Sequence, residues 1–384
     1  GDVYKRQKYG YEPERHSLEL TASEQELIRR VGAAGFQKVI IVINSDNPVE
    51  LGLVEENAEI DAVLLVGGMG TEGFRAFPDI LTGTVNPSGR LSDLYASDFT
   101  ADPTYPNQAD LTGGEYLRDG IFVGERVTLS NSVYTNLTPQ FIAQNGLRSN
   151  GNTMQYVFQN YEEGIYSGYR YYETRALTEG EAWYRESVVY PFGFGLSYTQ
   201  FDQYISDWRI EKEYIEADIV VRNIGNCPGK TAVQLYYSAP YGEGTANPHK
   251  IEKSAIVLGA FAKTGIIQPG REEEITLRIF IEDMASYDDE VFGCYVLDEG
   301  IYEISLRTDS HSVAYSESAG AKTAGDQVIR WYNGRMIVFN EGNPRSSEKY
   351  ANSEEGLVYK AATNAFTRTL EGISPSFTEL SRSD

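Results

Sequence analysis

Two short apolar runs set the strongest limits on how the first hundred residues fold. They are KVIIVIN at residues 38–44 and DAVLLV at residues 61–66. Uninterrupted apolar runs of this length are typical of strands that are buried on both faces of a sheet. Between them, Asn47 is the expected N-cap of a helix, with Pro48 in its first turn and Glu50 completing a capping box. Strand, helix and strand in this order predict a parallel βαβ unit, and therefore an α/β domain.

The flanking residues extend this prediction. Thr21 and Glu24 form a second capping box, which predicts a helix over residues 21–34. Residues 67–73 (GGMGTEG) are a glycine-rich turn that opens a short helix through about residue 81, and Pro78 is expected to kink or end that helix. Residues 100–160 are polar with little periodicity, and loops of this length in compact domains are usually functional or disordered.

A different pattern begins after about residue 203. Short strand-like runs alternate with turn signals and predict an antiparallel β-sandwich of about 100 residues. The clearest of these runs are residues 217–223, 231–238, 274–281 and 300–307. Residues 316–327 have the composition of a linker, and residues 328–384 show no strong period.

Composition narrows the possible partners. A formal net charge of −23 repels phosphate backbones and anionic lipid, so we expect neither a nucleic-acid nor a membrane partner; a neutral ligand such as a sugar is compatible. No apolar run reaches the length of a membrane-spanning helix. No His/Cys cluster has metal-ligand spacing, and the two cysteines, Cys227 and Cys294, are expected to be reduced thiols in a cytoplasmic protein.

Carboxylates are the main candidates for chemistry. The loop at residues 67–73 lacks a dinucleotide or P-loop spacing, and Glu72 would repel a phosphate, so nucleotide binding is disfavoured. Glu72, Glu163 and Glu173 lie near glycines or aromatic residues, as site carboxylates often do. Among 56 acidic residues, however, any single one is more often a solvated surface group.

A family resemblance rests on several motifs in a fixed order. They are NSDNPVELG at 44–52, DAVLL at 61–65, GTEG at 70–73, DILTG at 79–83, VNPSGRL at 85–91, EGIYSGYRYYE at 163–173 and YPFGFGLSY at 190–198. Together they resemble the second domain of family 3 glycoside hydrolases. The later strands resemble the fibronectin-type domain of the same family, through segments at 223–225, 229–236, 261–264, 268–270, 286–288 and 300–302.

The resemblance implies three regions. Residues 1–202 would be the α/β sandwich domain with a mostly parallel sheet, truncated at its N-terminus, and residues 203–315 a fibronectin type III-like sandwich. Residues 316–384 would be a poorly packed linker leading into a TIM-type barrel, because the tail resembles the approach to the barrel in members with inverted domain order. The chain would then be a fragment that lacks its barrel.

The implied activity is retaining hydrolysis of a terminal β-linked sugar, a β-glucoside or β-xyloside, with no metal or organic cofactor. The barrel would supply the nucleophilic Asp. The family's acid/base Glu commonly lies in a Gly-Glu-Gly-type segment before the first helix, which is missing here, so the fragment itself is expected to be inactive. Within the chain, Glu72 remains a candidate catalytic residue, and Met69, Thr71 and Phe74 are candidate substrate contacts, because ligand sites favour loops beyond strand ends.

Two other functions remain open. The chain is alternatively a non-catalytic carbohydrate-binding or scaffolding module, and a nucleotide-binding protein is a distant third possibility.

Overall fold

The computed structural model describes the two main regions of the chain. The residues described are 18–104, 132–136, 155–159, 163–242, 251–288, 294–314, 316, 327–339, 351–352, 357–358 and 381–382. Most of the 100–160 segment therefore lies outside the described residues, apart from the antiparallel pair β4 (Ser132–Asn136) and β5 (Gln155–Gln159).

The N-terminal region contains the predicted parallel pair. Strand β1 (Ile40–Ile43) runs parallel to β2 (Ala62–Leu65), with Ile40 opposite Ala62. Helix α2 (Ala22–Ala33) precedes them and begins at Thr21, whose side chain forms the expected capping box with Glu24. These three elements confirm the prediction of an α/β unit.

The prediction that both faces of this pair are buried is wrong for the described residues. Ile43 packs with Leu51 and Val54 in a core that α2 and the following turn help to build. On the opposite face, Ile40 is 43% and Val42 is 40% exposed. Since successive side chains of a strand point to opposite faces, helices on one side cover only alternate residues.

The helix predicted from Asn47 is also wrong. The observed helix, α3 (Gly52–Glu55), is one turn long and starts after Leu51. The Ser45 hydroxyl accepts from the Asn47 amide at 3.2 Å and so holds a bend at this point. The Glu50 carboxylate accepts from the amide of Phe99 at 2.8 Å rather than completing a capping box.

Short elements complete the α/β region. The glycine-rich helix ends at Gly73, and Pro78 lies in the first turn of a separate helix instead of kinking or ending the first one. The elements are α4 (Gly70–Gly73), α5 (Phe77–Leu81), β3 (Tyr95–Ala96), η1 (Phe99–Ala101), α9 (Tyr169–Glu179), α10 (Glu181–Ser187) and β6 (Val188–Tyr190). β3 pairs antiparallel with β6, which connects the chain before residue 100 with the chain after α10.

The second region is an all-β sandwich, as predicted. Its sheets have the orders β10-β9-β14-β15, β11-β8-β7 and β12-β13-β16. The strands are β7 (Phe201–Ile210), β8 (Tyr214–Asn223), β9 (Ala232–Ser238), β10 (Val257–Lys263), β11 (Glu272–Phe280), β12 (Ser286–Asp288), β13 (Cys294–Leu297), β14 (Gly300–Arg307), β15 (Val328–Asn333) and β16 (Ile337–Phe339), with the 3₁₀ turn η3 (Ile281–Met284) after β11. Ile219, Leu235 and Ile304 are fully buried in its core.

The sandwich continues past residue 315, where a linker was expected. β15 pairs antiparallel with β14, and β16 pairs with β13. Ile329 and Phe339 belong to the sandwich core, so burial of these apolar residues holds the two strands in place. Beyond them, the described residues include a short pair, β17 (Ala351–Asn352) and β18 (Leu357–Val358). Cys227 and Cys294 are both free, as predicted.

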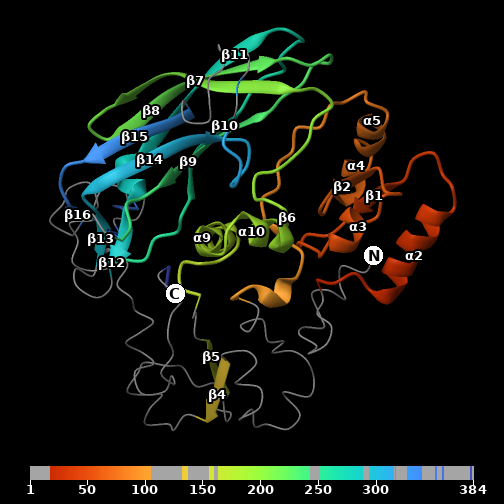
Figure 1. Ribbon diagram of the computed structural model, residues 1–384, viewed down its shortest axis with the longest axis horizontal. Helices are drawn as coiled ribbons and strands as arrows, with labels where there is room; N and C mark the ends of the chain where they lie inside the picture. Colours follow the sequence, from red (N-terminus) through yellow and green to blue (C-terminus); the bar gives the residue numbers. More distant parts are fainter. Residues whose placement is uncertain are drawn as a thin grey trace.

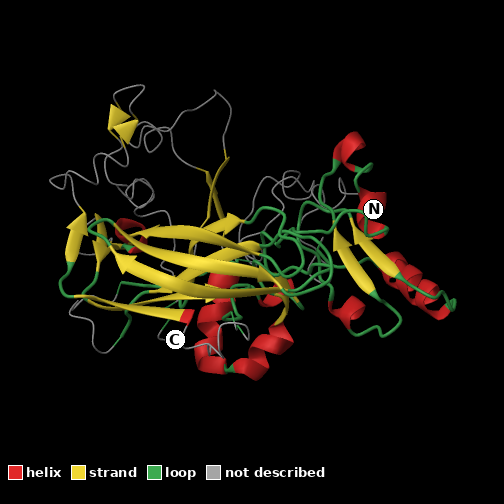
Figure 2. Cartoon of the chain, turned by 90° about the horizontal axis from the view of Figure 1, so that it is seen from above, coloured by secondary structure: helices red, strands yellow, loops and turns green. Residues whose placement is uncertain are grey.

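The helical hairpin α9–α10 lies between the sandwich and the parallel pair (Figure 1). Viewed from above, both helices lie against the strands of the sandwich (Figure 2). We call the contact surface between the α/β region and the sandwich the seam. It is the main meeting place of residues that are distant in sequence.

Candidate functional site

The four predicted site residues lie together on one exposed turn. Glu72 in α4 has a side chain that is 74% exposed and forms an ion pair with Arg75 at 2.9 Å. Phe74 is 54% exposed, and Met69 is the half-buried N-cap residue of α4. Thr71 lies in the same turn. The exposed Glu72–Arg75 pair is an ordinary surface arrangement, so a catalytic or substrate-binding role for these residues stays a prediction.

Three polar side chains of the family motifs, Glu173, Asn86 and Arg90, lie at the seam instead. Glu173, at the end of the EGIYSGYRYYE motif, is 7% exposed. Its Oε1 accepts from the Tyr184 hydroxyl at 2.7 Å and from the Ser310 hydroxyl at 2.8 Å. Its Oε2 lies 3.0 Å from Nδ1 of His311. A carboxylate enclosed in this way joins the helical hairpin to the sandwich and is not available to attack a substrate.

His311 completes this network on the sandwich side. Its ring stacks on that of Tyr184, with centroids 3.7 Å apart. Its Nε2 lies 3.0 Å from a carboxylate oxygen of Glu181. The hydrogen bond to Glu173 raises the pKa of His311 above its ordinary value, while burial opposes this. The geometry therefore favours an imidazolium held between two carboxylates.

Glu163, the other carboxylate considered above, is also buried, at 6% exposure. Its backbone carbonyl accepts from the amide of Tyr166 at 2.8 Å, within the turn that leads into α9. This placement is that of a turn residue within the fold.

The VNPSGRL motif links the two regions in a second way. Asn86 accepts from the Tyr198 amide at 2.8 Å and from the Ser197 hydroxyl at 2.9 Å, and its Nδ2 donates to the Pro228 carbonyl at 3.0 Å. Arg90 donates to the Thr231 hydroxyl at 2.9 Å. Burial lowers the pKa of Arg90. Both motif residues therefore act as connections between the α/β region and the turn before β9.

Tyr169 of α9 adds further aromatic contacts at the seam. The Tyr169 ring stacks on Phe192 at 4.6 Å and meets Tyr236 of β9 edge-on at 6.4 Å. The Tyr169 hydroxyl accepts from the Leu258 amide at 3.1 Å. Burial of this kind contributes roughly 1.5–3 kcal/mol per large side chain.

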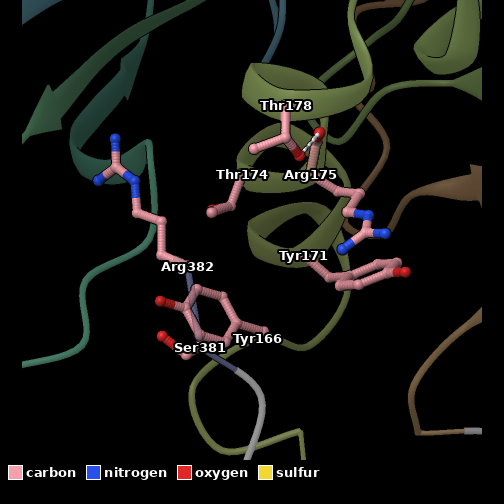
Figure 3. Close-up of a pocket in the computed structure, with 7 residues that line it drawn as sticks. All are labelled: Tyr166, Tyr171, Thr174, Arg175, Thr178, Ser381 and Arg382. Atoms are coloured by element: carbon pink, nitrogen blue, oxygen red, sulfur yellow. Dashed lines mark hydrogen bonds between the residues drawn. The ribbon is translucent and has the colours of Figure 1, made fainter. Parts of the chain in front are cut away.

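A small cavity lies beside α9 (Figure 3). Its volume is about 30 Å³, enough for one or two water molecules. Its lining combines α9 and the preceding turn with a late part of the chain: Tyr166, Tyr171, Thr174, Arg175, Thr178, Ser381 and Arg382. The cavity is too small for a sugar, but it marks where residues 381–382 dock beside α9.

A larger hollow lies on the other side of Tyr171 and Arg175. It has a volume of about 300 Å³ and combines aromatic rings with acidic, basic and hydroxyl groups. Its lining residues are Ser97, Asp98, Ala101, Tyr171, Tyr172, Arg175, Glu179, Trp183 and Ser187. Arg175 and Glu179 form an ion pair at 3.0 Å, and Trp183 stacks on Tyr172 with centroids 6.0 Å apart. Aromatic planes with a few polar groups are typical of small-molecule sites.

The described residues offer no group of three His, Cys, Asp or Glu side chains placed to hold a metal ion. Within the same residues, no helix has both the length and the apolar character needed to cross a membrane.

Residue-by-residue reasoning from the sequence missed the seam and the larger hollow. The seam joins residues more than a hundred positions apart, such as Glu173 and His311, and no local period marks such a pairing. A usable signal was present, because the motifs at 85–91, 163–173 and 190–198 combine polar residues with glycines and show no clear helix or strand period. Such residues mark close contacts as often as catalysis.

Comparison with known proteins agrees with this architecture. Residues 3–198 match the model of the glycosyl hydrolase family 3 C-terminal domain, and residues 231–310 match that of a fibronectin type III-like domain. "Beta-glucosidase A" of Butyrivibrio fibrisolvens is 34% identical over 332 residues, covering 80% of this chain and 33% of the relative. "Beta-glucosidase" of Ruminococcus albus is 28% identical over 95% of this chain and 30% of its own length.

Solved structures are similar as well. Beta-glucosidase 3B from Thermotoga neapolitana, in complex with glycerol, superposes with a TM-score of 0.60 at 27% identity, over 84% of this chain and 35% of that one. A beta-glucosidase from Paenibacillus barengoltzii gives a TM-score of 0.61 at 28% identity, over 86% and 30%.

The chain thus spans about a third of the length of the curated relatives it matches. The first family model covers slightly more than half of the chain, and the order of the two matched domains is that of the two regions described above. The chain therefore belongs to glycoside hydrolase family 3, of which it carries the C-terminal α/β domain and the fibronectin type III-like domain.

Proposed function

We propose that this chain is part of a β-glucosidase that releases terminal β-linked glucose with retention of configuration. The observation that supports this most is the match to relatives named beta-glucosidase over most of the chain. Retaining hydrolysis uses two carboxyls about 5–5.5 Å apart, one as nucleophile and one as acid and base. We place both outside the described residues, with the nucleophile on a barrel domain of the complete protein.

In this proposal the chain has a structural task in catalysis. The acid/base and the nucleophile come from different domains, so their separation depends on how rigidly those domains are held. Hydrogen bonds at the seam, such as those of the buried Glu173 and the half-buried Asn86, resist relative movement of the α/β domain and the sandwich. A misplacement of about 1 Å at a reacting centre costs on the order of a hundredfold in rate.

The test compares this chain with the complete gene product on nitrophenyl β-glucoside and nitrophenyl β-xyloside. We expect turnover by the complete protein, with the glucoside preferred, and none by the 384-residue chain. A Glu72→Gln variant of the complete protein should keep its kcat within about twofold. Robust turnover by the chain itself that Glu72→Gln abolishes would contradict the proposal, since the chain would then hold its own site.

The larger hollow favours a second candidate function, carbohydrate binding without catalysis. Trp183 and Tyr171 offer aromatic rings for stacking on a sugar, and Asp98, Arg175 and Glu179 offer hydrogen bonds to hydroxyl groups. Titration calorimetry of the chain with glucose and cellobiose tests this. A Trp183→Leu variant should weaken binding at least tenfold, and Trp208→Leu, an exposed tryptophan on β7, should not. Unchanged affinity in Trp183→Leu, or no binding by the parent chain, would exclude the hollow as a sugar site.

A further inference from the structure

The carboxylate of Glu252 collects hydrogen bonds from three parts of the chain. The Tyr166 hydroxyl, in the turn before α9, donates to Oε2, and the Tyr241 hydroxyl, after β9, donates to Oε1 at 3.1 Å. The Ser381 hydroxyl donates to Oε1 at 2.8 Å, and the Arg382 amide donates to Oε2 at 2.9 Å. One carboxylate therefore joins the α/β domain, the sandwich and residues 381–382.

The arginine side chain adds an independent set of contacts. The Arg382 guanidinium lies over the Tyr241 ring, 4.6 Å from its centroid, which is a cation–π geometry. It also donates to the Lys253 carbonyl at 3.3 Å. Burial lowers the pKa of Arg382, and nearby Tyr166, Tyr241 and Glu252 oppose this effect. The site is thus shaped for a guanidinium as well as for a backbone amide.

Residues 381 and 382 lie about 130 positions from Glu252, so no local chain geometry requires this meeting. Both are half-buried, although a tail without strong periodicity was expected to pack poorly. Figure 3 shows Ser381 beside the Tyr166 ring at the edge of the small cavity. The contacts involve hydroxyl, amide and guanidinium donors facing carboxylate, carbonyl and ring acceptors, which is a complementary set.

We propose that Tyr166, Tyr241 and Glu252 form a docking site for a Ser-Arg segment, and that Ser381-Arg382 of this chain is its occupant. The site fastens this segment to the seam between the two domains. In a longer protein, this contact would fix the position of Arg382 relative to both domains. The proposal concerns binding within this chain and stands whether or not the glycosidase activity proposed above is found.

Hydrogen exchange of the Arg382 amide measures occupancy directly, because that amide is bonded to the Glu252 carboxylate. Exchange is followed by mass spectrometry on the C-terminal peptide of the intact chain. We expect exchange at least tenfold slower than in the free peptide. Glu252→Gln should increase the exchange rate at least tenfold, whereas the matched control Glu299→Gln, a half-buried glutamate that also accepts from a tyrosine hydroxyl, should change it less than twofold.

A second variant tests the same contact even if Glu252→Gln does not fold. Arg382→Ala alters the occupant and leaves the sandwich untouched, so strand amides of β8 and β11 should keep their protection while exchange of residue 382 speeds up at least tenfold. Arg382→Lys keeps the charge but loses the planar group over Tyr241. The exchange rate of residue 382 in this variant should lie between those of the parent chain and Arg382→Ala. Free-peptide exchange at residue 382 in the parent chain, or no change in Arg382→Ala, would overturn the proposal.

Discussion

The Glu173 carboxylate on α9 lies 3.0 Å from Nδ1 of His311, in the loop after β14, and this contact crosses the seam between the two domains. The two residues are 138 positions apart, and the same carboxylate also accepts from Tyr184 and Ser310. Stability of the seam should therefore depend strongly on this one side chain. The first two predictions follow from it.

Glu173→Ala should lower the free energy of unfolding by about 3 kcal/mol or more, because it removes the shared acceptor of two buried hydroxyls, each costing roughly 1–3 kcal/mol when left without a partner. Urea unfolding followed by tryptophan fluorescence measures the change. Glu179→Ala serves as the control on the same helix, since its carboxylate is 41% exposed and paired only at the surface with Arg175. A loss below about 0.5 kcal/mol is expected there. Equal effects of the two variants would contradict the role given to Glu173.

The pH dependence of the seam follows from His311. Its pKa is raised in the folded state, chiefly by the hydrogen bond to Glu173. A raised pKa contributes stability that is fully present below the unfolded value of about 6.5 and disappears as pH rises through the folded value. The chain should therefore lose stability as the pH rises above about 6.5. In His311→Asn this loss should be smaller, so the two stability curves should converge at high pH. Parallel curves across this range would contradict the prediction.

Several parts of the fold follow from local sequence. The β1–β2 pair, the capping box at Thr21 and the main sandwich strands were predictable because apolar period, cap chemistry and turn residues act over a few positions. The absence of a helix at Asn47 was not predictable, because Ser45 accepts from the Asn47 amide and Glu50 accepts from the Phe99 amide. Phe99 lies about fifty residues from Glu50, so no local pattern contains this partner.

The candidate site was harder to predict than the fold. Glycine-rich loops and nearby carboxylates drew attention to Glu72, which the structure leaves on an exposed surface. The polar residues at the seam, the buried Glu173 and the half-buried Asn86, have partners from the sandwich. Their environment depends on how two domains meet, and a single sequence carries little information on that contact.

Asn86 provides a third prediction. Its side-chain amide bonds to the Tyr198 amide, the Ser197 hydroxyl and the Pro228 carbonyl, so it ties the chain just before β7 to the turn between β8 and β9. Asn86→Ala should lower stability by about 2 kcal/mol, since hydrogen bonds of this kind contribute about 1 kcal/mol each and some are replaced by water. Asn86→Asp keeps the acceptor but loses the donor to Pro228, and its effect should be about half as large. Differential scanning calorimetry should show the lower melting temperature, and an Asp variant as damaging as Ala would argue against the acceptor role.

Gly193 gives the last prediction, because it lies in close contact with β9 of the sandwich. Its φ is +81°, and a Cβ added there would lie 2.3 Å from Oε1 of Gln234 and 2.9 Å from the Tyr236 hydroxyl. Gln234 is itself held by a hydrogen bond to the Gly193 carbonyl at 3.1 Å, so it has little freedom to move.

Gly193→Ala should therefore cost about 3 kcal/mol or more, from left-handed backbone strain of about 1–2 kcal/mol and from displacement of buried strand residues. Gly180→Ala separates these two causes, since Gly180 has a similar φ of +87° but no atom within 4 Å of the added Cβ. That variant should lose only about 1–2 kcal/mol. Urea unfolding of both variants gives the difference directly. If they lose the same amount, Gly193 is not tightly packed against β9, and the α/β domain is held to the sandwich by other contacts, such as the hydrogen bonds of Glu173 and Asn86.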